Sequence, residues 1–243
     1  MTTVAIDNSQ RMAAKVAGWS GLLTFAIVVF GNFVLLNPLT VPGNAAATAQ
    51  NIVAHETQFR STVVCFLAYS LGVVVLLSAL YVILKPVNPG LALAGAFSRL
   101  VFALLWLLST LNMLSALRLL SNANYLQVFE PDRLQALAKL HLGANFDDYY
   151  VGLPFFGLAA TICAWLWLKS NYIPKGLAIL GVIASAWCVL CAFIFLIFPH
   201  FNKIVNDYIF DSPMALFELV LSFWLLFKGL KTVESSEALA GGA

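Results

Sequence analysis

The sequence predicts an all-α integral membrane bundle of six transmembrane helices, with interfacial helical segments in the two long outer loops. Hydrophobic residues make up 61% of the 243 residues and charged residues only 10%, whereas a soluble domain carries about 25% charged residues. Such a chain cannot cover a water-facing surface with polar groups, so lipid is its expected solvent. The apolar runs are long and do not alternate with polar residues, which favours helices over a closed barrel.

The first two spans are expected at residues 16–36 and 61–84. The first run, of about twenty apolar residues, exceeds the ~7–15 residues of a signal-peptide core, so we expect a retained membrane anchor. Arg60 and Lys85 bracket the second run, as basic residues do when they extend to the two membrane surfaces. The connection between these spans, residues 37–59, has room for an interfacial helix.

The third and fourth spans are expected at residues 91–120 and 149–168. The pair Asn88-Pro89 precedes the third span and is typical of a helix start, with Asn as the N-cap and Pro as the first helical residue. Apolar residues at helical spacing within the connection 121–146 suit a segment that lies at the membrane surface.

The fifth and sixth spans are expected at residues 176–198 and 213–230. The pair Ser212-Pro213 repeats the start signature, so the sixth helix is expected to begin at Pro213. Residues 234–243 are expected to form a flexible tail, because chain ends without apolar anchors are poorly ordered. The whole chain is expected to form one membrane domain.

The distribution of lysine and arginine predicts the orientation of the spans, because short cytoplasmic loops carry an excess of these residues. The side that holds both termini receives Arg11, Lys15, Lys85, Lys169, Lys175, Lys228 and Lys231. The other side receives Arg133, Lys139 and Lys203. This asymmetry predicts that both termini are cytoplasmic.

Two stretches of the sequence are similar to a known family. The first is Leu80-Tyr81-Val82-Ile83-Leu84-Lys85-Pro86-Val87-Asn88-Pro89-Gly90, and the second comprises Phe155-Phe156-Gly157-Leu158 and Lys169-Ser170-Asn171-Tyr172-Ile173-Pro174-Lys175. Together they resemble the bacterial membrane family catalogued as domain of unknown function 4386, with Asn171 where the family pattern has glycine. The resemblance implies a multi-helix protein of the bacterial inner (plasma) membrane, and it supplies no catalytic residues.

Ionisable residues inside the apolar spans are candidate functional residues, because burying a charge in lipid is costly. Arg99 and Arg118 belong to the third span and lie about 28 Å apart along a helix, close to the ~30 Å thickness of the hydrocarbon layer. One interpretation is that each arginine extends to one membrane surface. The apolar run 91–98 then projects beyond the bilayer. If this run is embedded instead, Arg99 lies deep and needs an acidic or carbonyl partner.

Glu218 is the strongest single candidate, because it is an isolated carboxylate inside the sixth span. An unpaired carboxylate there costs roughly 2.5–3.5 kcal/mol, so Glu218 should be protonated or paired with a cation. Arg60 and Arg118 are expected on the same outer half of the membrane and are therefore the expected partners. Two hypotheses remain open, namely the polar end of a ligand or proton site and a structural ion pair between two helices.

A second candidate site lies where the fourth span begins. His141, Asn145 and Asp148 fall at positions i, i+4 and i+7, so they share one face if a helix runs through Gly143. We expect this face to turn towards the helix bundle and away from lipid, with Tyr149 beside it. Gly143 is the residue that could break this helix.

Asn32 and Asn112 are single polar residues inside the first and third spans. Asparagine side chains often form hydrogen bonds between membrane helices, so we expect each to link two helices. The candidate catalytic residues are thus Glu218 and Asp148. The candidate ligand-binding residues are Arg60, Arg99, Arg118, His141 and Asn112.

No metal or cofactor is expected. His55, His141 and His200 fall on the outer side with several carboxylates, but their spacing matches no metal motif. Cys188 and Cys191 have apolar neighbours and are expected to be small buried side chains, not a redox pair. The net charge of +2 and the lack of a basic block do not indicate nucleic-acid binding.

Three functions remain open on these observations. The first is binding of a lipophilic small molecule, or of a partner, within the helix bundle. The expected partners are then the lipid bilayer, a lipophilic ligand and further copies of the chain. The second is an intramembrane acid–base enzyme of the isomerase or cyclase type with a lipophilic substrate. The third is a small carrier or channel, which the lack of a visible repeat disfavours.

Overall fold

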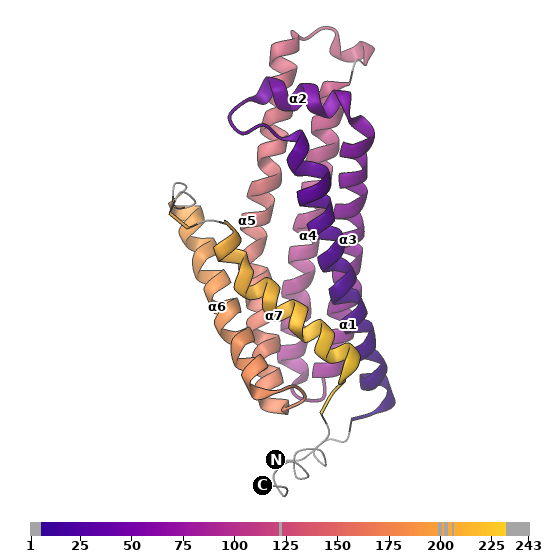
Figure 1. Cartoon of the computed structure of the whole chain (residues 1–243), viewed down its shortest axis with the longest axis vertical. Helices are drawn as coiled ribbons and strands as arrows, with labels where there is room; N and C mark the ends of the chain where they lie inside the picture. Colours follow the sequence, from indigo (N-terminus) through magenta and orange to yellow (C-terminus); the bar gives the residue numbers. More distant parts are fainter. Residues whose placement is uncertain (1–5, 122, 199–200, 202–203, 206, 232–243) are drawn as a thin grey trace, which may run out of the picture. The chain divides into compact units, whose positions relative to one another are not determined.

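The computed structural model describes residues 6–121, 123–198, 201, 204–205 and 207–231, and every regular element within them is a helix (Figure 1). The elements are α1 (Asn8–Val29), the π-helix η1 (Phe30–Leu36), the 3₁₀-helix η2 (Asn37–Leu39), α2 (Ala45–Ala54), α3 (Glu56–Leu84), α4 (Pro89–Leu120), the 3₁₀-helix η3 (Asn124–Leu126), α5 (Pro131–Ser170), α6 (Lys175–Ile197) and α7 (Asp207–Phe227). His200, Lys203 and the expected tail 234–243 lie outside the described residues.

Five helices among the described residues are long and apolar enough to cross a membrane. They are the continuous run Asn8–Leu39, which joins α1, η1 and η2, and the helices α3, α4, α5 and α6. The apolar part of α7, Ser212–Phe227, is shorter. Helices of this length and composition indicate a membrane protein, because lipid is the solvent that tolerates their exposed apolar side chains.

The contacts between residues divide the chain into two compact units. The first unit comprises Met1–Leu23, Gly72–Phe102 and Leu153–Ala243, and the second comprises Thr24–Leu71 and Ala103–Gly152. Because α1, α3, α4 and α5 each contribute residues to both units, every unit is built from parts of helices distant in the sequence.

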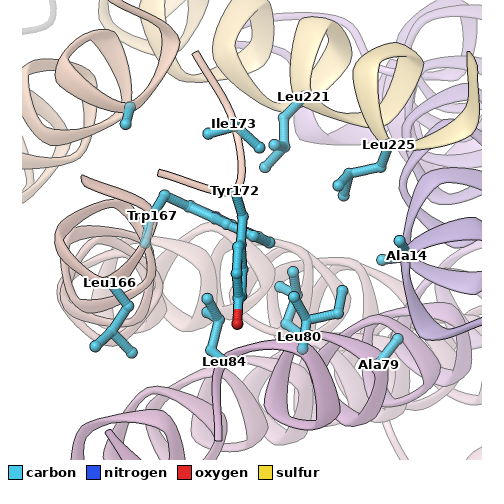
Figure 2. Close-up of a cluster of buried hydrophobic side chains, with 14 of the residues drawn as sticks. Ala14, Ala79, Leu80, Leu84, Leu166, Trp167, Tyr172, Ile173, Leu221 and Leu225 are labelled. Atoms are coloured by element: carbon cyan, nitrogen blue, oxygen red, sulfur yellow. The ribbon is translucent and has the colours of Figure 1, made fainter. Parts of the chain in front are cut away.

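The core of the first unit surrounds Tyr172, in the turn between α5 and α6. Figure 2 shows the Tyr172 ring extending towards Leu80 and Leu84 of α3, with Trp167 of α5 beside it. Gln10 of α1 is 1% exposed and donates hydrogen bonds from Nε2 to the Ile83 carbonyl oxygen at 3.0 Å and to the Tyr172 hydroxyl at 3.3 Å. Polar bonds therefore join α1, α3 and this turn inside an apolar core.

Close packing between helices of the first unit depends on glycines of α1 and α6. A Cβ atom at Gly18 would lie 2.6 Å from Leu226 Cγ and 2.9 Å from the Ser222 carbonyl oxygen of α7. A Cβ atom at Gly181 of α6 would lie 2.5 Å from Cζ of Phe217. Small residues that allow helices to approach in this way are characteristic of membrane helix packing. The helix α7 is thus packed tightly against both α1 and α6.

The second unit contains the helix α2, in the first long connection, where a helix was expected. The Asn44 side chain caps it by accepting a hydrogen bond from the Ala47 N–H at 3.0 Å. Asn32 of η1 donates to the Val28 carbonyl oxygen at 3.0 Å, one turn earlier in its own helix. The expectation that Asn32 links two helices is therefore wrong, because the wider π-helical turn gives its amide a backbone acceptor nearby.

The start of α4 confirms the interpretation of Asn88-Pro89. Pro89 is the first residue of the helix, and Asn88 Oδ1 accepts a hydrogen bond from the Leu91 N–H at 2.9 Å. The same interpretation of Ser212-Pro213 is wrong, because α7 begins at Asp207 and Pro213 lies inside it. Proline is tolerated inside membrane helices, where neighbouring groups satisfy the carbonyl that it leaves without an N–H donor.

The helix α5 is much longer than the expected span 149–168, since it runs without interruption from Pro131 to Ser170. The segment expected to lie as a separate helix in the second long connection is instead the first part of α5. Gly143 does not break the helix. A single glycine costs only about 1 kcal/mol relative to alanine, and side chains on both sides of Gly143 bond to α4.

Candidate functional site

An ion pair between α4 and α7 lies within the first unit. Arg99 Nη2 lies 2.6 Å from Glu218 Oε1, although the two residues are 119 positions apart in the sequence. The Arg99 side chain is 7% exposed and the Glu218 side chain 30% exposed. The guanidinium carbon of Arg99 also lies 5.0 Å from the ring centre of Phe156, close enough for a cation–π attraction. Two opposite charges are therefore held together in apolar surroundings.

This pair corrects two expectations about the charged residues. Arg60 does not pair with Glu218, because its Nε lies 2.6 Å from Oε1 of Glu56 on the same helix, with both side chains more than half exposed. Arg118 is exposed in the last turn of α4, and Glu218 pairs with Arg99. Arg99 differs from both in burial, since it is 6% exposed whereas Arg60 and Arg118 are exposed.

The acidic partner that one interpretation of Arg99 required is present in the structure. Extension to a membrane surface requires an exposed guanidinium, whereas Arg99 is 6% exposed as a whole residue. The alternative required an acidic or carbonyl partner for a deep arginine, and Glu218 supplies the acidic one. The backbone carbonyl oxygen of Glu218 accepts a hydrogen bond from the Ser222 hydroxyl, one turn later in α7, at 2.7 Å.

A small cavity lies beside the ion pair within the first unit. Its volume of about 30 Å³ accommodates one or two water molecules. Arg99 and Glu218 line it together with otherwise mainly apolar residues of α1, α3, α5 and α7. These are Ala17, Gly21, Leu76, Leu80, Ala160, Cys163, Trp167, Met214, Phe217, Leu221, Ser222 and Leu225. The cavity thus combines an apolar wall with a concentrated pair of charges.

A polar network lies within the second unit, between α4 and α5. Asn112 Nδ2 donates to Asp148 Oδ2 at 2.7 Å, and the Asn112 Oδ1 atom lies 3.2 Å from His141 Nδ1. Ser109 of α4 bonds to Asn145 of α5. The prediction that His141, Asn145 and Asp148 share a face turned towards other helices is therefore confirmed. Asn112 links α4 to α5, as expected for a polar residue in a membrane helix.

Tyr149, which follows Asp148 in the sequence, packs against other aromatic rings of the second unit. The ring centres of Trp106 and Tyr149 lie 6.1 Å apart, and those of Trp106 and Phe66 lie 5.0 Å apart. The two candidate catalytic residues belong to different units, Glu218 to the first and Asp148 to the second. Within the described part of the chain, no three histidine, cysteine, aspartate or glutamate side chains gather as metal ligands do.

Three residues were not among the candidates from the sequence. They are Gln10, which forms hydrogen bonds in the core, and Cys163 and Trp167, which line the cavity. A signal for Gln10 was present, since Asp7 and Gln10 exchange the two hydrogen bonds of a capping box. No sequence signal marked Cys163 and Trp167 among many similar residues in apolar spans. Their position at the cavity depends on contacts between helices that are distant in the sequence.

Comparisons with known proteins bear on the family resemblance and not on the two polar sites. The model of a family described as "Domain of unknown function (DUF4386)" matches residues 16–229. An uncharacterized protein of Archaeoglobus fulgidus is 28% identical over 157 residues, which cover 64% of this chain and 76% of that protein. The similarity therefore extends beyond the bacterial proteins that the resemblance indicated. No solved structure matches the chain.

Proposed function

The chain belongs to the family described as domain of unknown function DUF4386, and from this premise we propose that it binds a lipophilic small molecule with a small anionic head group. The head group occupies the cavity beside Arg99 and Glu218, within the first unit. The observation that carries the proposal is the charge pair in the wall of a mainly apolar cavity. Ligand sites commonly combine apolar walls with a few polar groups that orient the ligand.

A purely structural ion pair is the alternative to a binding site. A structural pair in a protein interior requires close packing and further hydrogen bonds, because these offset the cost of removing both charges from water. Here both charged residues line the cavity, and the Glu218 side chain is the more exposed of the two. Glu218 can therefore move away while Arg99 stays buried, which exposes a guanidinium to an incoming anion.

The size of the cavity limits what can enter it. About 30 Å³ admits a head group of a few heavy atoms but not a whole lipophilic molecule. The apolar tail then lies outside the cavity, against apolar side chains or lipid. Arg99 is suited to the head group, since a guanidinium presents its donors in a planar fork that matches oxyanions.

The arrangement of the chain in the membrane is part of the proposal. We propose that α7 is a sixth span, because the whole helix of 21 residues measures about 32 Å and its apolar part Ser212–Phe227 about 24 Å, against a hydrocarbon thickness of ~30 Å. With six spans both termini lie on one side, and the excess of Lys and Arg places that side in the cytoplasm. The membrane is then the plasma membrane of the cell, and further copies of the chain are potential partners.

Binding of dodecanoate tests the proposal directly. The purified chain in nanodiscs of neutral phosphatidylcholine is titrated with radiolabelled dodecanoate, and empty nanodiscs measure partition into lipid. We expect saturable binding that dodecyltrimethylammonium does not compete for. Arg99→Gln should weaken it about 10–100-fold, the effect of losing a hydrogen bond to a charged group. Glu218→Gln should strengthen it, because Glu218 competes with dodecanoate for Arg99.

Arg60→Gln is the matched control. Arg60 also lies 2.6 Å from a glutamate, but its pair is exposed on one helix, so its loss should leave dodecanoate binding unchanged. Arg99→Lys keeps the positive charge should Arg99→Gln fail to fold, and it should retain weaker binding. The proposal is overturned by the absence of saturable binding, or by equal effects of Arg60→Gln and Arg99→Gln.

A further inference from the structure

A buried hydrogen-bond donor lines the cavity beside the ion pair. Trp167 of α5 is 1% exposed and belongs to the cavity wall. Its Nε1 atom is buried and has no hydrogen-bond acceptor among the described residues. An indole N–H can only donate, and buried donors in native proteins almost always have an acceptor. The cavity that Arg99 lines is therefore also lined by a residue whose buried N–H requires an acceptor.

The position of the Trp167 ring is fixed by its neighbours. The ring packs against Tyr172 at a distance of 6.5 Å between ring centres, in an edge-to-face arrangement. Figure 2 shows Trp167 and Tyr172 inside the buried apolar cluster of the first unit. Tyr172 in turn accepts a hydrogen bond from Gln10. A ring held in this way cannot turn its N–H towards solvent without disrupting the core.

We propose that Trp167 Nε1 donates a hydrogen bond to the head group of the ligand, and that this head group is a carboxylate. This inference rests on the proposed function and specifies its ligand class. One carboxylate oxygen accepts from the Arg99 guanidinium and the other accepts from Trp167. Trp167 is then a specificity-determining residue for ligand binding.

The chemistry of the cavity selects a carboxylate over other head groups. Arg99 and Trp167 both only donate, so a head group that only accepts satisfies both. An ammonium offers no acceptor and is repelled by Arg99. A phosphodiester is larger than a carboxylate and fits poorly in about 30 Å³. A primary alcohol is uncharged, so its hydrogen bond to the Arg99 guanidinium is weaker than that of a carboxylate.

Trp167→Phe tests the inference, because it removes the N–H and keeps an aromatic ring. We expect its dissociation constant for dodecanoate to rise about tenfold, with saturable binding retained through Arg99. Wild-type chain should bind dodecanoate more tightly than dodecanol or dodecyl phosphate. Trp224→Phe is the matched control, since Trp224 Nε1 is also buried without an acceptor among the described residues but does not line the cavity. It should leave the affinity unchanged.

The indole N–H resonance provides a second measurement that does not depend on how a variant folds. In ¹⁵N-tryptophan-labelled wild-type chain, dodecanoate should shift the Trp167 signal downfield and leave the Trp224 signal in place. An unmoved Trp167 signal, or unchanged affinity in Trp167→Phe, overturns the inference. If Arg99→Gln still weakens binding in that case, the proposed function stands, whereas the loss of both effects removes both proposals.

Discussion

The Arg99 guanidinium and the Glu218 carboxylate lie 2.6 Å apart, the same distance that separates Arg60 from Glu56. The two pairs differ in burial and in connection. Arg99 and Glu218 join two helices and are mostly withdrawn from solvent, whereas Arg60 and Glu56 lie on one helix with more than half of each side chain exposed. This contrast provides a control inside the molecule for each test of the buried pair.

Glu218→Gln should destabilise the chain more than Glu56→Gln. Removal of one partner from a buried pair leaves an uncompensated charge and costs about 3–5 kcal/mol, a value to be reduced here because Glu218 is 30% exposed. An exposed pair contributes about 0–1 kcal/mol. Thermal unfolding in detergent, followed by circular dichroism, should therefore show the larger decrease in Tm for Glu218→Gln. An equal or larger decrease for Glu56→Gln would contradict this expectation.

The double variant Arg99→Met, Glu218→Leu should separate stability from binding. Replacing both members of a buried pair by apolar residues is often neutral or stabilising by about 1–4 kcal/mol. We expect the double variant to unfold at a Tm close to that of the wild type, and above that of Glu218→Gln, while it loses saturable dodecanoate binding. Retained binding in a stable double variant would show that the charges are not part of the site.

Asn112→Leu should reduce stability more than Asn32→Leu. The Asn112 amide bonds to Asp148 and lies within hydrogen-bond distance of His141, both on another helix, whereas the Asn32 amide bonds to its own helix. Hydrogen bonds between membrane helices are worth about 0.6 kcal/mol on average and up to about 1.7 kcal/mol. The measurement is the Tm of both variants under identical conditions. The assignment of a linking role to Asn112 fails if the two variants unfold together.

Gly18→Ala and Gly143→Ala should change stability in opposite directions. A methyl group at Gly18 would meet the Ser222 carbonyl oxygen at 2.9 Å, and overpacking of this kind costs about 1–3 kcal/mol. At Gly143 the same methyl group meets nothing within 4 Å, so alanine should stabilise α5 by roughly 1 kcal/mol. The sign of the change in Tm checks both expectations, and stabilisation by Gly18→Ala would show that α1 and α7 pack less closely.

The proposed topology predicts where introduced cysteines react. In a background without the four native cysteines, Asn44→Cys and Ser235→Cys are tested in intact cells with a membrane-impermeant maleimide. Asn44→Cys should react from outside, and Ser235→Cys should react only after the membrane is permeabilised. Labelling of both sites from the same side would rule out an odd number of crossings between them.

The existence of most helices could be predicted from the sequence, because long apolar runs leave the backbone few alternatives in lipid. Helix ends were harder to predict. Asn88-Pro89 and Ser212-Pro213 carry the same local signal, but only Pro89 begins a helix. The difference arises outside these residues, since α7 starts earlier at Asp207. A proline signature shows where a helix can start, and the surrounding packing decides whether it does.

The candidate site could be predicted only in part. The apolar run around Glu218 identified it as an isolated carboxylate that is either protonated or paired with a cation. Helical spacing correctly placed His141, Asn145 and Asp148 on one face. The prediction that Arg60 or Arg118 pairs with Glu218 was wrong. Which arginine reaches Glu218 depends on how the helices pack. Trp167 could not be selected among six tryptophans, since its importance comes from the cavity that distant helices enclose.

The sequence separation of Arg99 and Glu218 has a consequence for biosynthesis. Ribosomes add about 5–20 residues per second, so the 119 positions between these residues correspond to roughly 6–24 s of translation. Throughout this interval Arg99 has been made while the acid of α7 has not. The nascent chain therefore carries an arginine whose counter-charge arrives near the end of synthesis, and its insertion into the membrane must accommodate that delay.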